Sequence, residues 1–275
     1  MKTSPFIDPQ HGATFEEEGY VILDLLSPSS VASLLEVFHS VEAEHAYDFV
    51  ASVLLPDHSM RHTLNAIISP IFEKEILPVL DGYKIILGNF ASKRAQSFGK
   101  MPLHQDSTFV DEHETIGITI WCPLVDVSEE NGWLGLVPGS HKLGNYYREA
   151  ISLPYPEVYD AIENSYLTYL PMKAGQVLLM DNRMIHGSQP NKSNAVRPVA
   201  AGVAVETSAT LLCCYNERSS ADSQTEIYEV PQDFYERHMM MTRPQEGTLL
   251  RTVPAYLEPL TIERLEALRP VSAVV

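Results

Sequence analysis

His104, Asp106 and His186 are the residues of this 275-residue chain whose types and spacing best suit a metal ion. Side chains alternate along an extended strand, so His104 and Asp106 point to one face while Gln105 points away. His186 ends the apolar segment 176–186, which indicates a strand, and can supply a third ligand. Two imidazoles and one carboxylate leave coordination positions open, which is typical of non-haem Fe(II) sites. A His-x-Asp tripeptide by itself is weak evidence, because most such tripeptides are surface residues near a turn.

Arg197 and Ser188 strengthen this hypothesis. Arg197 lies eleven residues after His186, so a strand, a turn and the next antiparallel strand would return it to the same barrel mouth as His186. A guanidinium there can hold a carboxylate in a bidentate pair. The Ser188 hydroxyl can donate to the same carboxylate. Arg197 alone would be an ordinary surface residue, but its place in this set favours a binding role.

Secondary-structure elements must position these residues. Along the sequence, the predicted helices come before most of the predicted strands. Ser27, Pro28 and Ser29 are typical of a helix start, and apolar residues then recur at helical spacing. Residues 61–80 predict a second helix, interrupted by Pro70 and closed by Pro78. The predicted strands are residues 20–23, 83–90, 116–121, 176–180, 199–205 and 209–215. A last helix is predicted over residues 262–269.

Many short strands separated by turn residues predict a mainly β fold with flanking helices, of the jelly-roll or cupin-like kind. The helices precede the strands and do not alternate with them, which argues against a Rossmann fold. We expect a single domain over residues 1–275. It would comprise a helical N-terminal part (about 1–80), a β core (about 81–216) and a C-terminal extension (about 217–275).

The charge balance of the chain limits the kinds of binding partner that we expect. Asp and Glu number 36 against 19 Lys and Arg, giving a formal net charge of −17, which opposes binding to nucleic acid or to an anionic membrane. The three cysteines, Cys122, Cys213 and Cys214, do not suit a disulfide scaffold. The N-terminal residues lack the apolar core of a signal peptide, and the apolar runs are too short to span a bilayer. We therefore expect a cytoplasmic protein with a small-molecule substrate; the sequence does not predict its oligomeric state.

Several motifs occur in an order that resembles one family. They are the FEEEGYV run at residues 15–21, the PLHQD run at 102–106, the WCPLVDVSEENGWLGLVPGSHK run at 121–142, the HGSQPN run at 186–191, and Arg197. Together they resemble the phytanoyl-CoA dioxygenase family of Fe(II)/2-oxoglutarate oxygenases. The resemblance extends over roughly residues 14–215, and the combination of motifs is more specific than any one of them.

The resemblance implies a double-stranded β-helix fold. It also implies a dioxygenase that uses Fe(II), 2-oxoglutarate and O2 to hydroxylate a small organic substrate at an unactivated C–H bond, with succinate and CO2 as co-products. The site residues that it implies are the iron ligands His104, Asp106 and His186, the contacts to the distal carboxylate of 2-oxoglutarate Arg197 and Ser188, and the pocket residues Trp121 and Asn89. An intact carboxylate at Asp106 favours hydroxylation over halogenation, because related halogenases have Gly or Ala there.

Lys93 and Arg94, with Lys100, form the densest basic cluster of an acidic chain and precede the His-x-Asp motif. If they face the cavity, they could bind an anionic group of the substrate. The alternative is a solvated loop.

Two rival functions stay open. A non-catalytic β-helix binding or regulatory protein predicts a damaged set of ligands, and a cupin-type zinc or manganese isomerase would have no use for Arg197. His58 and His62 have helical spacing but no evident third ligand, so we do not expect a metal there. We expect residues 239–241, three methionines, to pack or to form a flexible cover, and not to form a set of ligands.

Overall fold

The computed structural model describes residues 4–41, 47–151, 155–217, 224–255 and 259–268. The helices are α1 (Pro9–Glu18), α2 (Pro28–Val41), α3 (His58–Glu75), α4 (Tyr159–Ser165), α5 (Phe234–Arg237) and α6 (Ile262–Glu266). The strands are β1 (Tyr20–Asp24), β2 (Phe49–Ala51), β3 (Tyr83–Lys93), β4 (Met101–His104), β5 (Ile118–Pro123), β6 (Leu134–Leu136), β7 (Thr168–Leu170), β8 (Gln176–Asp181), β9 (His186–Ser188), β10 (Arg197–Glu206), β11 (Leu212–Asn216), β12 (Gln224–Glu229) and β13 (Thr248–Pro254).

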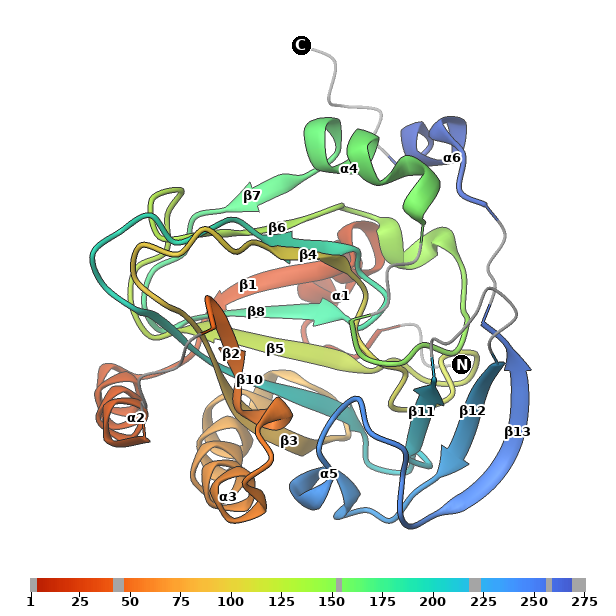
Figure 1. The fold of residues 1–275 in the computed structure, drawn as a ribbon, viewed down its shortest axis with the longest axis horizontal. Coiled ribbons are helices and arrows are strands. Elements are labelled where there is room, and N and C mark those ends of the chain that lie inside the picture. Colours follow the sequence, from red (N-terminus) through yellow and green to blue (C-terminus); the bar gives the residue numbers. More distant parts are fainter. Residues whose placement is uncertain (1–3, 42–46, 152–154, 218–223, 256–258, 269–275) are drawn as a thin grey trace.

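Two antiparallel sheets form the β core and confirm the predicted fold class (Figure 1). One has the strand order β1-β8-β5-β10-β3-β2 and the other has the order β4-β9-β6-β7. A buried apolar cluster joins them, with Trp121 and Leu178 from the first sheet and Leu134 and Leu136 from the second. The two sheets therefore pack face to face over a shared core, as in a jelly roll.

Helices α2 and α3 pack against the outer face of the six-stranded sheet. Leu34 and Phe38 of α2 and Phe72 of α3 belong to one buried cluster with Val177 and Leu179 of β8. The intervening residues of β8 point into the core between the sheets. Burial on both faces explains why this strand is a continuous apolar run without alternation.

Helix α3 differs from its prediction at Pro70. The helix continues through this residue to Glu75, and it begins at His58, where the Asp57 side chain caps it by accepting from Met60 N. Leu64 and other residues of its apolar face are fully buried against the sheet. Tertiary packing thus outweighs the loss of one helical hydrogen bond at the proline.

The C-terminal part adds a third sheet, in the order β11-β12-β13. The expected strand at 209–215 begins later, as β11, and its adjacent cysteines Cys213 and Cys214 are buried within it, as expected. Helix α6 ends at Glu266, and the end of its predicted range, residue 269, lies outside the described residues. Within the described part of the chain, every helix is too short or too polar to traverse a bilayer.

Candidate functional site

The three predicted metal ligands meet between β4 and β9. His104 and His186 are direct partners in the antiparallel pairing of these strands, and their ring centres lie 4.2 Å apart. The Nε2 atom of each lies 3.9 Å from Asp106 Oδ1. One potential ligand atom from each residue lies within 4.8 Å of the other two, which is the spacing that a shared metal ion requires.

Backbone carbonyls set the orientation of both imidazoles. His104 Nδ1 lies 2.9 Å from Pro102 O, and His186 Nδ1 lies 3.0 Å from Met184 O. A carbonyl can only accept, so Nδ1 carries the proton and Nε2 keeps its lone pair for a metal. Burial, and next the neighbouring His186, lower the pKa of His104 to about 4, so its ring is neutral at neutral pH.

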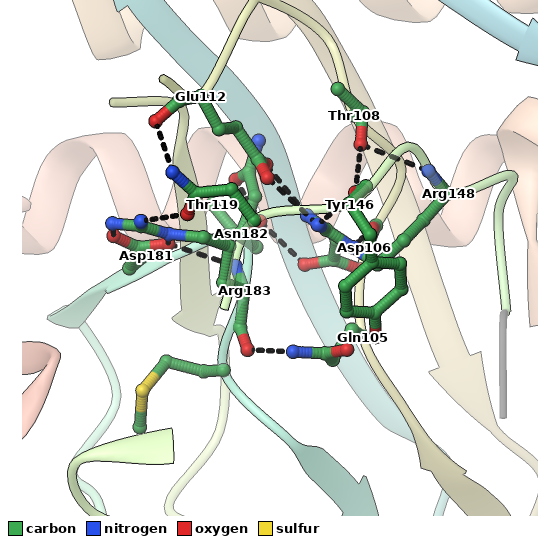
Figure 2. A network of polar contacts seen from close by, with 12 residues as sticks. Gln105, Asp106, Thr108, Glu112, Thr119, Tyr146, Arg148, Asp181, Asn182 and Arg183 are labelled. Atoms are coloured by element: carbon green, nitrogen blue, oxygen red, sulfur yellow. Dashed lines mark hydrogen bonds and ion pairs between the residues drawn. The ribbon is translucent and has the colours of Figure 1, made fainter. Parts of the chain in front are cut away.

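The Asp106 carboxylate is held from the side opposite the histidines. Thr119 Oγ1 donates to Asp106 Oδ2 at 2.5 Å, which leaves Oδ1 facing the two imidazoles. The main chain of Asp106 is fixed as well: its N–H donates to Asn182 O at 3.1 Å, and its carbonyl accepts from Arg148 Nε at 3.0 Å. Figure 2 shows these residues converging on Asp106 from separate segments.

A buried ion pair anchors this network. Arg148 Nη1 donates to Glu112 Oε2 at 2.7 Å and Nη2 donates to Oε1 at 2.6 Å, with exposed fractions of only 1% and 8% for the two residues (Figure 2). Arg148 also donates to Tyr146 O. The pair therefore ties the segment that follows the His-x-Asp motif to the loop before α4.

Arg197 opens β10 beside the triad and is buried, with an exposed fraction of 2%. Its guanidinium carbon lies 5.4 Å from the centre of the Trp121 ring. Burial lowers the pKa of Arg197 to about 10, so the group remains charged at neutral pH. Among the described residues, its Nε and Nη1 atoms have no hydrogen-bond partner. Buried unpaired donors of a cation are costly, so this site suits an anion such as a carboxylate.

One cavity of about 180 Å³ connects the predicted site residues. The residues from the prediction that line it are His104, Asp106, His186, Arg197, Ser188, Trp121 and Asn89. The Asn89 side chain donates to Ala201 O at 3.3 Å, which turns its amide nitrogen toward the sheet. The metal-ligand and carboxylate-binding candidates therefore share one space.

Lys93 and Arg94 lie elsewhere, which corrects the predicted basic loop over the cavity. Lys93 is fully buried at the end of β3, and its Nζ donates to Gly99 O, Ser188 O and Gln189 O at 3.2, 3.1 and 2.6 Å. Arg94 is exposed and pairs with Asp48. Neither lines the cavity. Local sequence could not reveal this, because two of the three carbonyls that accept from Lys93, those of Ser188 and Gln189, come from a distant segment.

The sequence did not assign four residues to the site that shape it in the structure. Thr119, Arg148 and Glu112 belong to the network behind Asp106, and Met240 lines the cavity together with the segment 49–54. Thr119 lies in a predicted strand and could have been found as a polar residue in an apolar run. The sequence predicted that the three methionines pack or form a flexible cover, but it did not connect Met240 with this cavity. Of the described residues, only the triad groups three possible metal ligands; His58 and His62 are stacked on α3.

Comparison with known proteins gives a consistent result. Residues 36–199 match the family model described as phytanoyl-CoA dioxygenase (PhyH). The phytanoyl-CoA dioxygenase domain-containing protein 1 homolog of Dictyostelium discoideum is 34% identical over 104 residues, covering 34% of this chain and 37% of that protein. The 1-deoxypentalenic acid 11-beta-hydroxylase of Streptomyces arenae is 32% identical over 116 residues, covering 38% and 39%. The match thus spans less than two fifths of these relatives' length.

Solved structures share the fold at low sequence identity. The epimerase SnoN, solved with Fe3+, alpha ketoglutarate and nogalamycin RO, has a TM-score of 0.54 at 18% identity, covering 94% of this chain and 98% of that one. HygX from Streptomyces hygroscopicus, solved with nickel, 2-oxoglutarate and hygromycin B, has a TM-score of 0.53 at 16% identity, covering 74% and 88%.

Proposed function

The chain belongs to the phytanoyl-CoA dioxygenase family, and on that premise we propose that it is an Fe(II)- and 2-oxoglutarate-dependent dioxygenase that hydroxylates a small organic substrate. The observation that carries the proposal is the buried Arg197 guanidinium, whose Nε and Nη1 lack partners beside the His104, Asp106 and His186 triad. A dicarboxylate that reaches from the metal to Arg197 would satisfy both donors.

Each residue has a defined task in this proposal. His104 Nε2, His186 Nε2 and Asp106 Oδ1 would hold the metal, and three coordination positions would remain for 2-oxoglutarate and O2. Bound Fe(II) supplies the chemistry that couples conversion of 2-oxoglutarate and O2 into succinate and CO2 to oxidation of a C–H bond. Arg197 would orient the distal carboxylate and Ser188 would donate to it, both from the cavity wall.

The cavity wall would protect the reaction from water. Most of the described lining residues are apolar, and the side chain of Asp106 is only 24% exposed. Exclusion of water limits side reactions of reactive species. Asp106 provides a carboxylate where a halogenase would leave a position for halide, so the proposed outcome is hydroxylation of an unactivated C–H bond.

The free, buried thiols of Cys122, Cys213 and Cys214 fit a reducing compartment, and we place the protein in the cytoplasm on this ground.

Succinate release tests the proposal directly. The protein would be supplied with Fe(II), 2-oxoglutarate and ascorbate, with and without a panel of small molecules. We expect succinate from the wild type and none above background from His186→Ala. His58→Ala, which removes an exposed histidine on α3, serves as the matched control and should keep full activity. Wild-type turnover by His186→Ala, or no turnover by any metal-loaded sample, would contradict the proposal and favour a non-catalytic binding protein.

A further inference from the structure

We infer that the substrate is an uncharged and largely apolar molecule. It is selected by one wall of the cavity, which Val53 and Met240 form together. The inference rests on the proposed function, because it concerns the space that remains beside the metal and 2-oxoglutarate. It assigns a substrate class and two specificity-determining residues.

The side chains that line the cavity indicate the substrate class. Among the described residues that line the cavity, the ionisable side chains are those of the triad and Arg197. In the proposed function these four are engaged by the metal and by 2-oxoglutarate. The substrate therefore meets no free charge on the described wall, and a charged group placed there would be desolvated without a partner.

The uncharged polar side chains of the described wall are those of Asn89, Ser107, Thr119 and Ser188, and the proposed function assigns Ser188 to 2-oxoglutarate. Thr119 donates to Asp106, and the Asn89 amide nitrogen donates to Ala201 O. The apolar side chains that face the same space include Phe49, Val53, Leu54, Phe109 and Met240. Such a lining favours a ligand that is mostly hydrocarbon, with at most one neutral polar group to face Asn89 or Ser107.

The wall itself is built from two segments that are far apart in the sequence. Met240 N donates to Val53 O at 3.1 Å, which joins the chain after α5 to the 3-10 helix η1 (Ser52–Leu54). Arg61 of α3 fastens both sides, since Nη1 donates to Leu55 O at 2.5 Å and Nη2 donates to Arg237 O at 2.6 Å. Figure 1 shows α5 beside α3, in agreement with their contacts. The wall is therefore a fixed surface that can select by shape and polarity.

Three ligands with the same eight-carbon chain test the substrate class: octan-1-ol, octanoate and octylammonium. The protein would be loaded with Zn(II) and saturating 2-oxoglutarate, so that binding is measured by calorimetry without turnover. We expect octanol to bind at least tenfold more tightly than octanoate or octylammonium. Octanoate or octylammonium binding as tightly as octanol, or binding of none of the three, would overturn the inference.

Two variants with the same change in net charge test the wall. Met240→Lys places a cation at the cavity, whereas Leu249→Lys places one on β13 at a residue that is 49% exposed and does not line the cavity. We expect Met240→Lys to weaken octanol binding at least tenfold and to reverse the preference toward octanoate, with Leu249→Lys unchanged. Val53→Phe, which fills the same space with hydrocarbon, should also weaken octanol binding. Equal behaviour of the two lysine variants would overturn the role of Met240.

This experiment separates the inference from the proposed function. Ligand preference is measured on the Zn(II)-loaded protein and does not depend on turnover. If the Fe(II) protein forms no succinate, the proposed function fails, but the measured ligand preference is unaffected. Succinate formation that is stimulated by charged compounds and not by neutral apolar ones would leave the proposed function intact and overturn the substrate class.

Discussion

Lys93 and Arg197 lie directly opposite each other in the pairing of β3 with β10, yet their donors are used in different ways. The three N–H groups of Lys93 match three backbone carbonyls, two of them in the chain at and after the end of β9. In the described part of the chain, Nε and Nη1 of Arg197 have no partner. Lys93 thus fastens the strand that carries His186, whereas Arg197 keeps its donors for an anion.

Replacing Arg197 with alanine should weaken 2-oxoglutarate binding while iron stays bound. Loss of a buried, charge-assisted pair costs about 2–5 kcal/mol, which corresponds to roughly 30- to 3,000-fold in affinity. The measurement is an anaerobic titration of 2-oxoglutarate into the Fe(II)-loaded protein, followed by the metal-to-ligand absorption band. Arg94→Ala, at an exposed arginine, is the matched control. An affinity of Arg197→Ala within about threefold of wild type would mean that another residue holds the carboxylate.

Lys93 should make stability depend on pH above neutrality. Burial, and next the charge of Arg197, lower the pKa of Lys93 from 10.5 to about 7. Between these values the unfolded chain binds more protons than the folded protein, so the folded protein gains stability as the pH rises and loses it as the pH falls toward 7. The upper limit is about 1.4 kcal/mol per pH unit, and the three carbonyl acceptors, which favour the ammonium, reduce it.

The Lys93→Met variant isolates this effect, because methionine does not titrate. Urea unfolding of both proteins without 2-oxoglutarate would be measured from pH 7 to pH 10. The difference in unfolding free energy, wild type minus variant, should increase over this interval. A difference that stays constant would show that Lys93 keeps its ordinary pKa in the folded protein.

Thr119→Val should weaken metal binding, because it removes the hydroxyl that donates to Asp106 Oδ2. Loss of such a partner to a ligating side chain typically costs about 10- to 100-fold in metal affinity. Competition with a chelator for Fe(II) measures the change. Thr119→Ser keeps the hydroxyl and should bind iron within a few-fold of wild type, so equal affinities for the valine and serine variants would refute the positioning role.

Arg148→Met should destabilise the fold by about 3–5 kcal/mol, since it leaves the buried Glu112 carboxylate without its partner. Glu112→Leu should have a similar effect. Combining the two removes both charges, so the double variant should lose less stability than the sum of the single losses. Urea unfolding of the four proteins gives this coupling, and strictly additive losses would show that the pair contributes nothing as a unit.

Local sequence was sufficient for the centre of the site. Alternation along an extended chain indicated that His104 and Asp106 share one face, and the structure brings Arg197 to the cavity that they line with His186. His104 and Asp106 are near neighbours along the chain. One short connection, which crosses from the four-stranded to the six-stranded sheet, separates His186 from Arg197. The same kind of signal was available for α1, where Asp8 caps the helix, Pro9 occupies its first position and Gly19 ends it with φ of 83°, although the sequence analysis predicted no helix there.

The misplaced and missing residues depend largely on partners from distant segments. A lysine in an acidic chain would ordinarily be solvated, and Lys93 is buried because its Nζ donates to the carbonyl of nearby Gly99 and to those of distant Ser188 and Gln189. Met240 faces the cavity because its segment pairs with Val53, far away in the sequence. No periodicity within one segment encodes such contacts, so a reading of local patterns could not find them.

Because Val53 and Met240 contact each other outside the two main sheets, the choice of substrate and the reaction itself can evolve independently. His104, His186 and Arg197 lie on strands of the two main sheets and Asp106 lies two residues after β4, whereas this contact joins η1 to the chain after α5. Mutations at the contact would reshape the substrate space without disturbing the groups proposed to hold the metal and 2-oxoglutarate. A lineage could therefore acquire new substrates by drift at these two positions while its reaction stays the same.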